Sequence, residues 1–559
     1  MLDSKPSWQR IGEAKRADRA AKIPTEWIIP TDIIPSKETK DVQDWPKTSG
    51  FFTPEELMIT ESTASEVVSK IARGEWKAQQ VLSAVSKRAA VAQQLLNCAT
   101  EIYFDEGMKI AKQLDDFYEK ESRTIGPLHG LPISFKDQFQ LKGVDSTIGY
   151  IAYANKPASE DSTLVSLLRS AGAVPYIKTN VPATLMMGES VNNVFGRTVN
   201  PRNRDLTTGG SSGGESALVT FRGSFMGVGT DIGGSIRHPC SFTGLYGLRP
   251  SHGRVSYQGA VNTFLGQEAV RSCAGPMCRS PGDIRLFMSS LVAQKPWLFD
   301  PQAIPIPWRK EEETLPKKLC FGFGMGDGVV TPTPPLRRAM EITKARLIAA
   351  GHEVVDYKPE EHEEATGIIK EMWMADGGEE FRRDFEASGE PYHPHLEGWA
   401  GGPFKGKKQS VFDTWQNQNR RALLATSWLN RWQATKDLTT TGRPIDGLIQ
   451  PSTPFPAPRH DRGYPYHWGS ISPLLDLTTG IFPVTKVDLE KDVVPKDWQP
   501  ISELDQKVMD YYGKPENHAN ALIGLVVIAR RLEEEKVISM LEVIKAALET
   551  SALQSLGPF

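Results

Sequence analysis

The sequence predicts an α/β protein, because apolar runs suited to buried strands alternate with segments of helical periodicity. Strand-like runs occur at 131–135 and 174–178, and helical patterns occur at 163–171 and 215–221. The alternation returns in the second half of the chain, where we expect strands at 319–323, 353–357 and 446–450 and helices at 335–350 and 534–548. Helices layered against a sheet are therefore expected.

The chain of 559 residues divides into an N-terminal arm and one large body. Residues 1–60 are polar and contain spaced prolines, which predicts a helix followed by an extended arm that wraps a core. The body begins with apolar residues at helical spacing over 63–73, 78–96 and 106–119. We expect residues 61–559 to form a single domain.

Composition excludes several classes of partner. Lys and Arg total 65 and Asp and Glu total 68, so the formal charge of -3 provides no field that would gather nucleic acid or anionic membrane. The N-terminus lacks the apolar stretch of a secretion signal, and the longest strongly apolar run, 522–529, is far shorter than the roughly 20 residues of a membrane span. Five scattered cysteines are typical of reduced thiols. We expect a cytoplasmic protein that acts on a small molecule.

The most unusual stretch, 209–234, contains nine glycines in 26 residues. Such density allows the backbone to approach another group closely. A phosphate loop is one interpretation, but the chain has no GxxxxGK(S/T) or GxGxxG motif. A nucleophile elbow is another, because residues 209–213 fit GxSxG around Ser211; that elbow needs a strand directly before it, and we expect residues 202–205 to form a polar turn.

A third interpretation makes Ser235 a nucleophile. Two glycines precede it, so the N–H groups of Ile232, Gly233, Gly234 and Ser235 could converge on one spot without any Cβ in the way. Such a turn would hold the oxyanion of a tetrahedral intermediate, where one donor changes the rate by about a hundredfold or more. A serine alone is a poor nucleophile, so a base is required as well.

Three blocks in a fixed order carry a resemblance to a known family. They are GPLHGLPISFKDQF at 126–139, GGSSGGE at 209–215 and GTDIGGSIRHP at 229–239. Together they resemble the amidase signature family, over approximately residues 57–541. The phrases VNNVFGRTVNPRN (191–203), YGLRPSHGR (246–254) and SELDQ (502–506) are similar to the fungal acetamidase and general amidase branch.

The resemblance implies a fold and a catalytic triad. The fold would be a large mixed open β-sheet flanked by helices on both faces, with a catalytic core at about 126–250. The triad would be Lys136 as base, Ser211 as bridge and Ser235 as nucleophile, with a cis peptide between Gly210 and Ser211. An ordinary lysine has a pKa near 10.4, so Lys136 can act as a base only if burial lowers that pKa; a fall of about three units corresponds to roughly 4 kcal/mol.

Neighbouring residues are assigned supporting roles. We expect Thr230, Asp231 and Arg237 to brace the turn by hydrogen bonds. Ser212 either orients Ser211 or caps the following helix, where Glu215 completes a capping-box spacing. No histidine, cysteine or acidic cluster has metal-ligand spacing, and we expect neither a metal nor a cofactor.

Substrate preference is expected to depend on an apolar pocket. By resemblance, Leu185, Met186, Met187 and Phe455 line or border it, although ordinary core packing would explain them nearly as well. The sequence departs from the family at Leu522 and Val526, where proline and glutamine are common, which leaves the shape of the pocket open. The resemblance also allows a homodimer.

The predicted function is hydrolysis of small aliphatic or aromatic amides to an acid and ammonia. Larger acyl amides or indoleacetamide are alternative substrates. A binding or scaffold protein that has lost catalysis is the alternative from another class, and it would be expected to show a broken triad.

Overall fold

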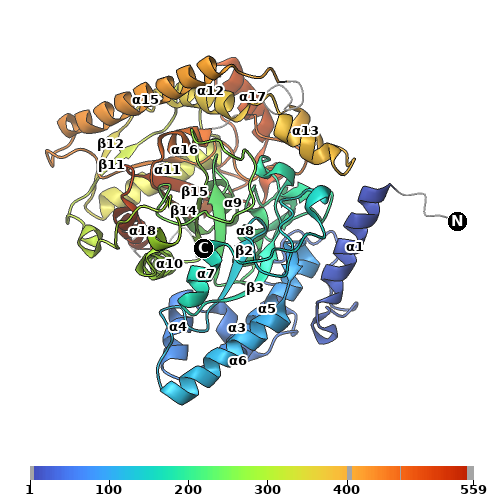
Figure 1. Ribbon diagram of the computed structural model, residues 1–559. Helices are drawn as coiled ribbons and strands as arrows, with labels where there is room; N and C mark the ends of the chain where they lie inside the picture. The colour runs from blue at the N-terminus through green and yellow to red at the C-terminus, as the bar shows by residue number, and fades with distance from the viewer. Residues whose placement is uncertain (1–5, 399–405, 466–467, 550–559) are drawn as a thin grey trace.

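The computed structural model describes residues 6–398, 406–465 and 468–549. An 11-stranded sheet runs through the molecule in the order β1-β3-β2-β8-β10-β9-β14-β15-β13-β11-β12 (Figure 1). Strands β2, β3 and β8 are parallel neighbours, and so are β11, β12 and β13, whereas the central pairs are antiparallel. The predicted large mixed open sheet is therefore confirmed.

The elements have the following bounds. The helices are α1 (Ser7–Ala21), α2 (Trp45–Thr48), α3 (Pro54–Glu61), α4 (Ala64–Ala72), α5 (Ala78–Leu96), α6 (Phe104–Glu121), α7 (Thr163–Ser170), α8 (Gly213–Thr220), α9 (Arg237–Thr243), α10 (Pro281–Ala293), α11 (Pro334–Ala349), α12 (His362–Trp373), α13 (Glu379–Glu386), α14 (Pro394–Gly398), α15 (Val411–Ala434), α16 (Ile471–Leu475), α17 (Glu503–Tyr512) and α18 (Glu534–Glu549). The strands are β1 (Ala99–Ile102), β2 (Pro132–Lys136), β3 (Val174–Thr179), β4 (Val191–Asn192), β5 (Gly196–Arg197), β6 (Val199–Asn200), β7 (Asn203–Thr207), β8 (Met226–Asp231), β9 (Tyr246–Arg249), β10 (Cys273–Cys278), β11 (Cys320–Phe323), β12 (Glu353–Asp356), β13 (Gly447–Pro451), β14 (Thr479–Lys486) and β15 (Leu522–Ile528).

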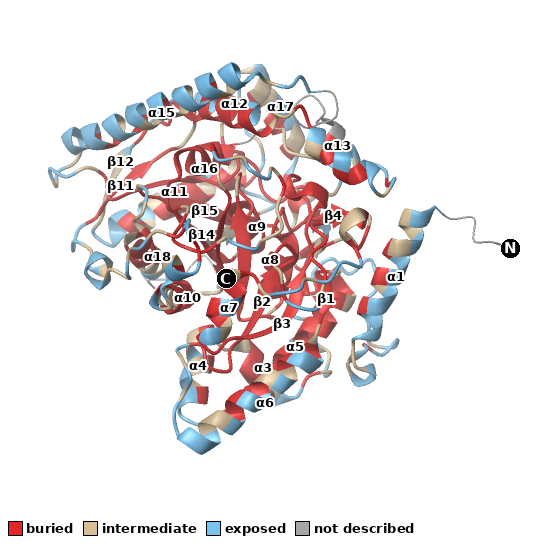
Figure 2. Ribbon diagram, in the orientation of Figure 1, coloured by how far each residue is buried: buried red, intermediate tan, exposed pale blue. Residues whose placement is uncertain are grey.

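Helices cover both faces of the sheet, as two successive residues of β14 show. A Cβ added at Gly480 would lie 2.8 Å from Val537 and 3.0 Å from Leu541 of α18. The next residue, Ile481, joins a different apolar cluster that includes Cys240 of α9. Because successive strand residues point to opposite faces, α18 and α9 lie on opposite sides of the sheet. Figure 2 shows the resulting pattern, with buried strands and helices exposed on their outer sides.

The elements predicted from periodicity are confirmed with shifts of one or two residues at their ends. The polar stretch 202–205 is an exception, because most of it belongs to strand β7 rather than to a turn. β7 pairs with β6 in a separate two-stranded sheet, and the Asn203 side chain bonds the carbonyl of Ala519. The turn is shorter than predicted, because Pro201 and Arg202 alone reverse the chain between β6 and β7, and hairpin pairing together with the distant contact to Ala519 outweighs the polar composition.

The N-terminal arm begins with α1, which lies along the outside of the body (Figure 1). Lys15 of α1 is buried and makes ion pairs with Glu101 at 2.6 Å and Asp145 at 2.9 Å. Farther along the arm, Ile29 and Val42 join the main apolar core. Within the described ranges, no helix combines the length and the apolar character needed to cross a membrane.

Candidate active site

Strand β2 carries Lys136 into the interior. Lys136 is the last residue of the strand and is fully buried. Its Nζ lies 2.6 Å from the Oγ of Ser211 and 2.7 Å from the Oγ1 of Thr230. The structure therefore brings together the predicted lysine and the predicted bridging serine, which are separated by 75 residues in sequence.

The surroundings of Lys136 favour its neutral form. Burial lowers the pKa of Lys136 from 10.5 to about 7, although the charges of Asp231, Glu215 and Asp137 oppose that fall. Burial acts in this direction because an ammonium loses its hydration when it leaves water. A lysine with a pKa near 7 is neutral in a large fraction of molecules at neutral pH. It can then accept a proton.

Thr230 connects Lys136 to a series of side-chain hydrogen bonds that was not predicted from the sequence. The Oγ1 of Thr230 accepts from Lys136 and donates to the Oε1 of Gln138 at 2.6 Å. Gln138 in turn donates to the hydroxyl of Tyr257 at 2.5 Å. Thr230 therefore contacts the lysine rather than bracing the turn as predicted. Gln138 lies in the turn that follows β2, closed by the Phe139 N–H to the Lys136 carbonyl at 3.0 Å, and no strand alternation marked it in the sequence.

Ser211 lies between β7 and α8, and the peptide bond between Gly210 and Ser211 is cis, as the family resemblance implies. Of the two roles considered for Ser212, orienting Ser211 or capping the helix, the side-chain cap is not formed. The Ser212 hydroxyl donates to the carbonyl of Thr230 at 3.3 Å and also accepts from the Thr230 N–H at 3.3 Å. The Glu215 side chain is likewise absent from the cap, because it turns into the core to accept hydrogen bonds from Ser134 and Thr179. Burial raises the pKa of Glu215 to about 7, against the opposing effect of these hydrogen bonds.

Ser235 is located on the turn between β8 and α9, and 9% of its surface is exposed. The N–H of Ser212 donates to the Ser235 carbonyl at 3.3 Å, so the two serine segments are held side by side. The Ser235 hydroxyl makes no hydrogen bond to any described residue. The link from Lys136 to Ser211 is thus formed, and the link from Ser211 to Ser235 is open. Catalytic hydrogen bonds are often long before substrate binds. The absence of a hydrogen bond between Ser211 and Ser235 is therefore compatible with a catalytic role for Ser235.

One of the four predicted oxyanion donors is already used. The N–H of Gly234 donates to Asp231 Oδ1 at 2.9 Å, so it is not available to a ligand in this conformation. The N–H groups of Ile232, Gly233 and Ser235 have no acceptor in the part of the chain that the structure describes. Glycine is required at Gly234, which has φ +133 and whose added Cβ would lie 2.3 Å from an imidazole carbon of His238.

Asp231 and Arg237 hold the turn from beneath. The Asp231 carboxylate accepts from Arg237 Nε and Nη2, both at 3.0 Å, and from the N–H groups of Gly234 and Ile236. Burial alone would raise the pKa of Asp231, but Arg237 and the more distant Arg249 lower it well below its usual range. The predicted bracing contacts of Asp231 and Arg237 are therefore present.

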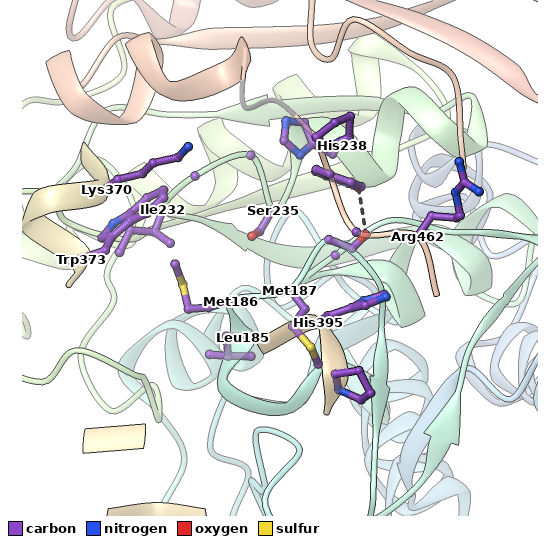
Figure 3. A pocket seen from close by; sticks show the side chains of 18 of the residues that line it. Leu185, Met186, Met187, Ile232, Ser235, His238, Lys370, Trp373, His395 and Arg462 are labelled. Carbon is purple, nitrogen blue, oxygen red and sulfur yellow. Dashed lines mark hydrogen bonds between the residues drawn. The ribbon is translucent and has the colours of Figure 1, made fainter. Parts of the chain in front are cut away.

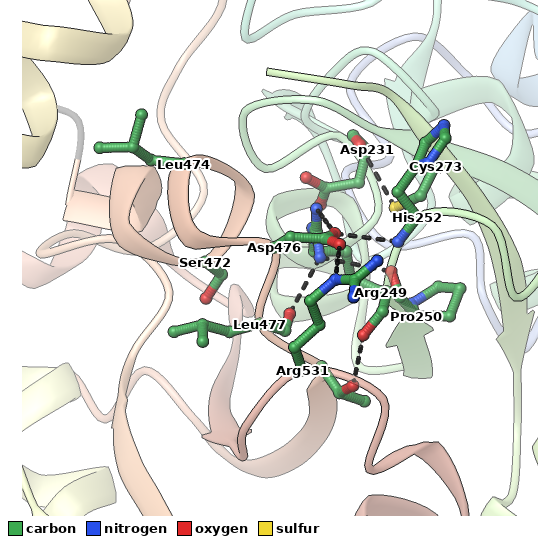
Figure 4. Close-up of polar contacts among 12 residues, drawn as sticks. Asp231, Arg249, Pro250, His252, Cys273, Ser472, Leu474, Asp476, Leu477 and Arg531 are labelled. Atoms are coloured by element: carbon green, nitrogen blue, oxygen red, sulfur yellow. Dashed lines mark hydrogen bonds and ion pairs between the residues drawn. The ribbon is translucent and has the colours of Figure 1, made fainter. Parts of the chain in front are cut away.

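A polar network continues behind this brace (Figure 4). The Sγ of Cys273 donates to the Asp231 carbonyl at 3.4 Å. Arg249 is fully buried and pairs with Asp476 at 3.1 Å, and Asp476 also accepts from Arg531 at 2.7 Å. The charge of Arg249 acts on Asp231 of the turn, and its partner Asp476 links it to Arg531, which follows β15.

A cavity of about 440 Å³ opens above Ser235 (Figure 3). Its volume lies within the range of about 300–1,000 Å³ that is typical of small-molecule sites. The described residues that line it are Leu185, Met186, Met187, Gly188, Gly210, Ile232, Gly233, Gly234, Ser235, His238, Lys370, Trp373, Pro394, His395, Arg462, Gly463, Tyr464, Pro465 and Tyr511. The cavity thus contacts the turn 232–235, the predicted methionines and one end of the Ser211 segment.

Comparison with known proteins identifies the family. The family model described as Amidase matches residues 80–538. The chain is 62% identical over 546 residues to the putative amidase kk1C of Curvularia clavata, covering 98% of this chain and 99% of the relative. It is 43% identical over 542 residues to an acetamidase of Emericella nidulans, covering 96% and 97%. The chain belongs to the amidase family.

Structural similarity agrees with this assignment. A fatty acid amide hydrolase matches with a TM-score of 0.91 at 32% identity, over 97% of this chain and 95% of that chain. The amidase is therefore an enzyme that hydrolyses amide bonds. The predicted family and fungal branch are confirmed.

The cavity of this amidase differs from the prediction at one residue. Leu185, Met186 and Met187 line the cavity, but Phe455 does not. Phe455 is fully buried behind the wall, with its ring centroid 5.3 Å from Tyr464 and 4.9 Å from Tyr511. Phe455 therefore fits the alternative interpretation as ordinary core, because Tyr464, nine residues later, and the more distant Tyr511 lie between it and the cavity.

The two family departures also lie away from the cavity. Val526 is buried in the apolar cluster of β15, where it pairs with Ile481 and Gln450 across neighbouring strands. Leu522 begins the same strand and packs near Gly244. Neither residue belongs to the described lining of the cavity, so these substitutions do not shape it directly.

Several lining residues of the amidase were missed by sequence reasoning. Trp373 lies against the turn 232–235, since a Cβ at Gly233 would be 2.6 Å from its ring. Lys370 precedes it by one helical turn on α12. His238, three residues after Ser235, also lines the cavity. No local motif marks Lys370 or Trp373, because α12 is brought to the turn only by the tertiary fold.

Beside the cavity, three residues have metal-ligand types. Glu189, His395 and Asp461 each place one possible ligand atom within 4.8 Å of the others. Arg197 already pairs with both carboxylates, at 2.9 Å with Glu189 and closely with Asp461. A cation at this position would have to displace the guanidinium, so we interpret the group as an ion-pair cluster.

Proposed function

We propose that the amidase uses Ser235 as its nucleophile, with Ser211 and neutral Lys136 as a proton relay. The observation that carries this proposal is the buried Lys136 Nζ at 2.6 Å from the Ser211 Oγ, together with the placement of Ser235 on the cavity. A serine hydroxyl becomes an effective nucleophile only when a base removes its proton. Lys136 meets that need because its pKa is about 7.

The reaction follows from these positions. The Ser235 Oγ attacks the amide carbonyl while its proton passes to Ser211, and the proton of Ser211 passes to Lys136. The negative oxygen that forms is stabilised by the N–H groups of Ile232, Gly233 and Ser235. The relay then reverses and protonates the leaving nitrogen, so that an amine or ammonia departs. Water attacks the acyl-enzyme with the same groups as base and returns the acid.

For the substrate, we propose small aliphatic or aromatic amides. The cavity volume of about 440 Å³ and the apolar part of its lining, which includes Leu185, Met186 and Met187, suit a compact acyl group. The likeness to a fatty acid amide hydrolase supports longer acyl amides as the second candidate. A series of acetamide, benzamide, indole-3-acetamide and fatty amides, compared by kcat/KM, distinguishes the two candidates.

A labelling experiment tests the nucleophile. A fluorophosphonate probe should attach to Ser235, and Ser235→Ala should abolish both labelling and amide hydrolysis. Ser241→Ala is the matched control, because Ser241 lies on α9 with a buried hydroxyl away from the cavity. Full hydrolysis by Ser235→Ala would refute the proposal. An unlabelled and inactive wild-type protein would favour a scaffold that has lost catalysis.

We also propose that residues 61–559 form one domain on which the arm 1–60 is docked. The buried ion pairs of Lys15 and the packing of Ile29 and Val42 into the main core support this arrangement. Limited proteolysis should cut within the arm before it cuts the body. Rapid cleavage at an internal boundary of the body would contradict the single domain.

A further inference from the structure

The charged groups of the cavity all have one sign. Lys370 and Arg462 line it, and none of its described lining residues is Asp or Glu. The two internal segments outside the described ranges, 399–405 and 466–467, also contain no Asp or Glu in their sequence. The cavity is thus a site with two cations and no acidic group among its described lining residues.

Lys370 lies on one side of Ser235, near Trp373 and Ile232 (Figure 3). No carboxylate of a described residue lies within the 4.0 Å of an ion pair with its ammonium. Lys370 is exposed to solvent where it borders the cavity, and the partial burial of its ammonium lowers its pKa, with no nearby charge to offset the effect. Such an ammonium gains stability when an anion enters the cavity.

Arg462 lies on the other side of Ser235, on the loop that precedes Tyr464 (Figure 3). Its guanidinium carbon is 5.1 Å from the ring centroid of Tyr511. Among the residues that the structure describes, no carboxylate forms an ion pair with Arg462. The stacked ring orients a guanidinium whose donors remain available to a ligand.

Five acidic residues are adjacent in sequence to residues that line the cavity, namely Glu189, Asp231, Glu371, Asp461 and Asp510. Asp231 pairs with Arg237, Glu371 with Arg420 and Asp461 with Arg197, and Asp510 accepts from Gln506. The fifth, Glu189, follows Gly188. Its carboxylate accepts from His460 and from the N–H of Asp461, the latter at 2.9 Å, and pairs with Arg197 at 2.9 Å. Only 5% of its side chain is exposed. Glu189 is therefore committed to other partners and does not neutralise Arg462 or Lys370.

A cleft that contains charges of one sign, enclosed by apolar walls, concentrates ligands of the opposite sign. Hydrogen bonds between a cation and a carboxylate are also about twice as strong as neutral ones. We propose that this amidase prefers amides that carry a carboxylate remote from the scissile bond, and that Lys370 or Arg462 binds this carboxylate. The inference rests on the proposed function, since it assigns the substrate class of the Ser235 site.

The test compares amides that differ only in the remote group. The monoamides of succinic, glutaric and adipic acid are measured against butanamide, pentanamide and hexanamide. For at least one chain length, kcat/KM of the acid should exceed that of the neutral amide by on the order of tenfold or more, as expected for one charge-assisted contact. This preference should fall as salt is added, because ions screen the attraction.

Variants assign the binding group. Lys370→Met or Arg462→Gln should lower the ratio of acidic to neutral kcat/KM by on the order of tenfold or more, and the variant that does so identifies the side that binds the carboxylate. Arg459→Gln is the matched control, because Arg459 is an exposed arginine three residues earlier that does not line the cavity. Its ratio should remain that of the wild type.

Two results would overturn the inference. One is a wild-type protein that hydrolyses the neutral amides as well as or better than the acids at every chain length. The other is an acid preference that both Lys370→Met and Arg462→Gln retain. Either result would leave the Ser235 mechanism intact if fluorophosphonate still labels Ser235, whereas loss of labelling together with inactivity on every amide would refute the proposed function itself.

Discussion

Replacing Lys136 with Met separates the catalytic role of this lysine from its effect on stability. Methionine is close to lysine in length and is apolar, so it fills the buried position without an amine. Loss of a general base lowers rates by about 10²- to 10⁴-fold. We expect Lys136→Met to lose at least this much of kcat/KM while the protein remains folded.

The same substitution should raise stability at low pH. The fall in the pKa of Lys136 from 10.5 to about 7 corresponds to about 5 kcal/mol, at 1.36 kcal/mol for each pKa unit. Below pH 7 both folded and unfolded states carry the proton, so the folded wild type bears the whole cost of a buried ammonium. Between about pH 7 and 10.5 only the unfolded state keeps the proton, and the stability of the wild type therefore rises with pH. The advantage of Lys136→Met should shrink across this window. The hydrogen bonds lost to Ser211 and Thr230 reduce its size.

Two measurements check these expectations. In the wild type, kcat/KM should rise with pH through an apparent pKa near 7 to a plateau, because the active form has a neutral Lys136. Thr230→Val removes an acceptor of the ammonium, so it should move this rise to lower pH. Melting temperatures of wild type and Lys136→Met, recorded from pH 6 to pH 10, should converge as the pH increases.

Each measurement can refute the reasoning. A pH profile without a rise near 7, or a rise that Thr230→Val leaves in place, would show that another group controls the reaction. Substantial hydrolysis by Lys136→Met would remove the lysine from the mechanism. A gap in melting temperature that widens with pH would contradict the lowered pKa.

Three further substitutions test the turn and the wall. Asp231→Asn should destabilise the protein by about 3–5 kcal/mol, measured by denaturation, because it leaves the buried charge of Arg237 unpaired; an unchanged denaturation midpoint would contradict the brace. Gly234→Ala should abolish fluorophosphonate labelling, because the added Cβ would collide with an imidazole ring, whereas Gly266→Ala, which also has positive φ but no atom within 4 Å, should label normally. Phe455→Ala should lower the free energy of unfolding by about 3–5 kcal/mol, because it removes a buried aromatic side chain. A free energy of unfolding within about 1 kcal/mol of the wild type would show that neighbouring side chains fill the space and would contradict this expectation.

The alternating elements were predictable because their signals are local. Helix α5 spans the predicted residues 78–96, and the strand ending at Lys136 shifted by one residue. Strands β8 and β10 escaped prediction, because glycines interrupt their apolar pattern. Those glycines are required by neighbours from other segments. An added Cβ at Gly227 would lie 2.2 Å from Glu215, and one at Gly275 would lie 2.1 Å from the Leu248 carbonyl.

The sequence by itself determined the family, the α/β architecture and the identities of the candidate triad residues, because these follow from residues close together in motifs. Only the tertiary structure decided the surroundings of each group. It showed that burial lowers the pKa of Lys136, that Asp231 occupies the N–H of Gly234, and that Lys370 and Arg462 lie on either side of Ser235. The physical reason is that burial, hydrogen-bond partners and local charge depend on atoms from distant segments, which meet only when the chain folds.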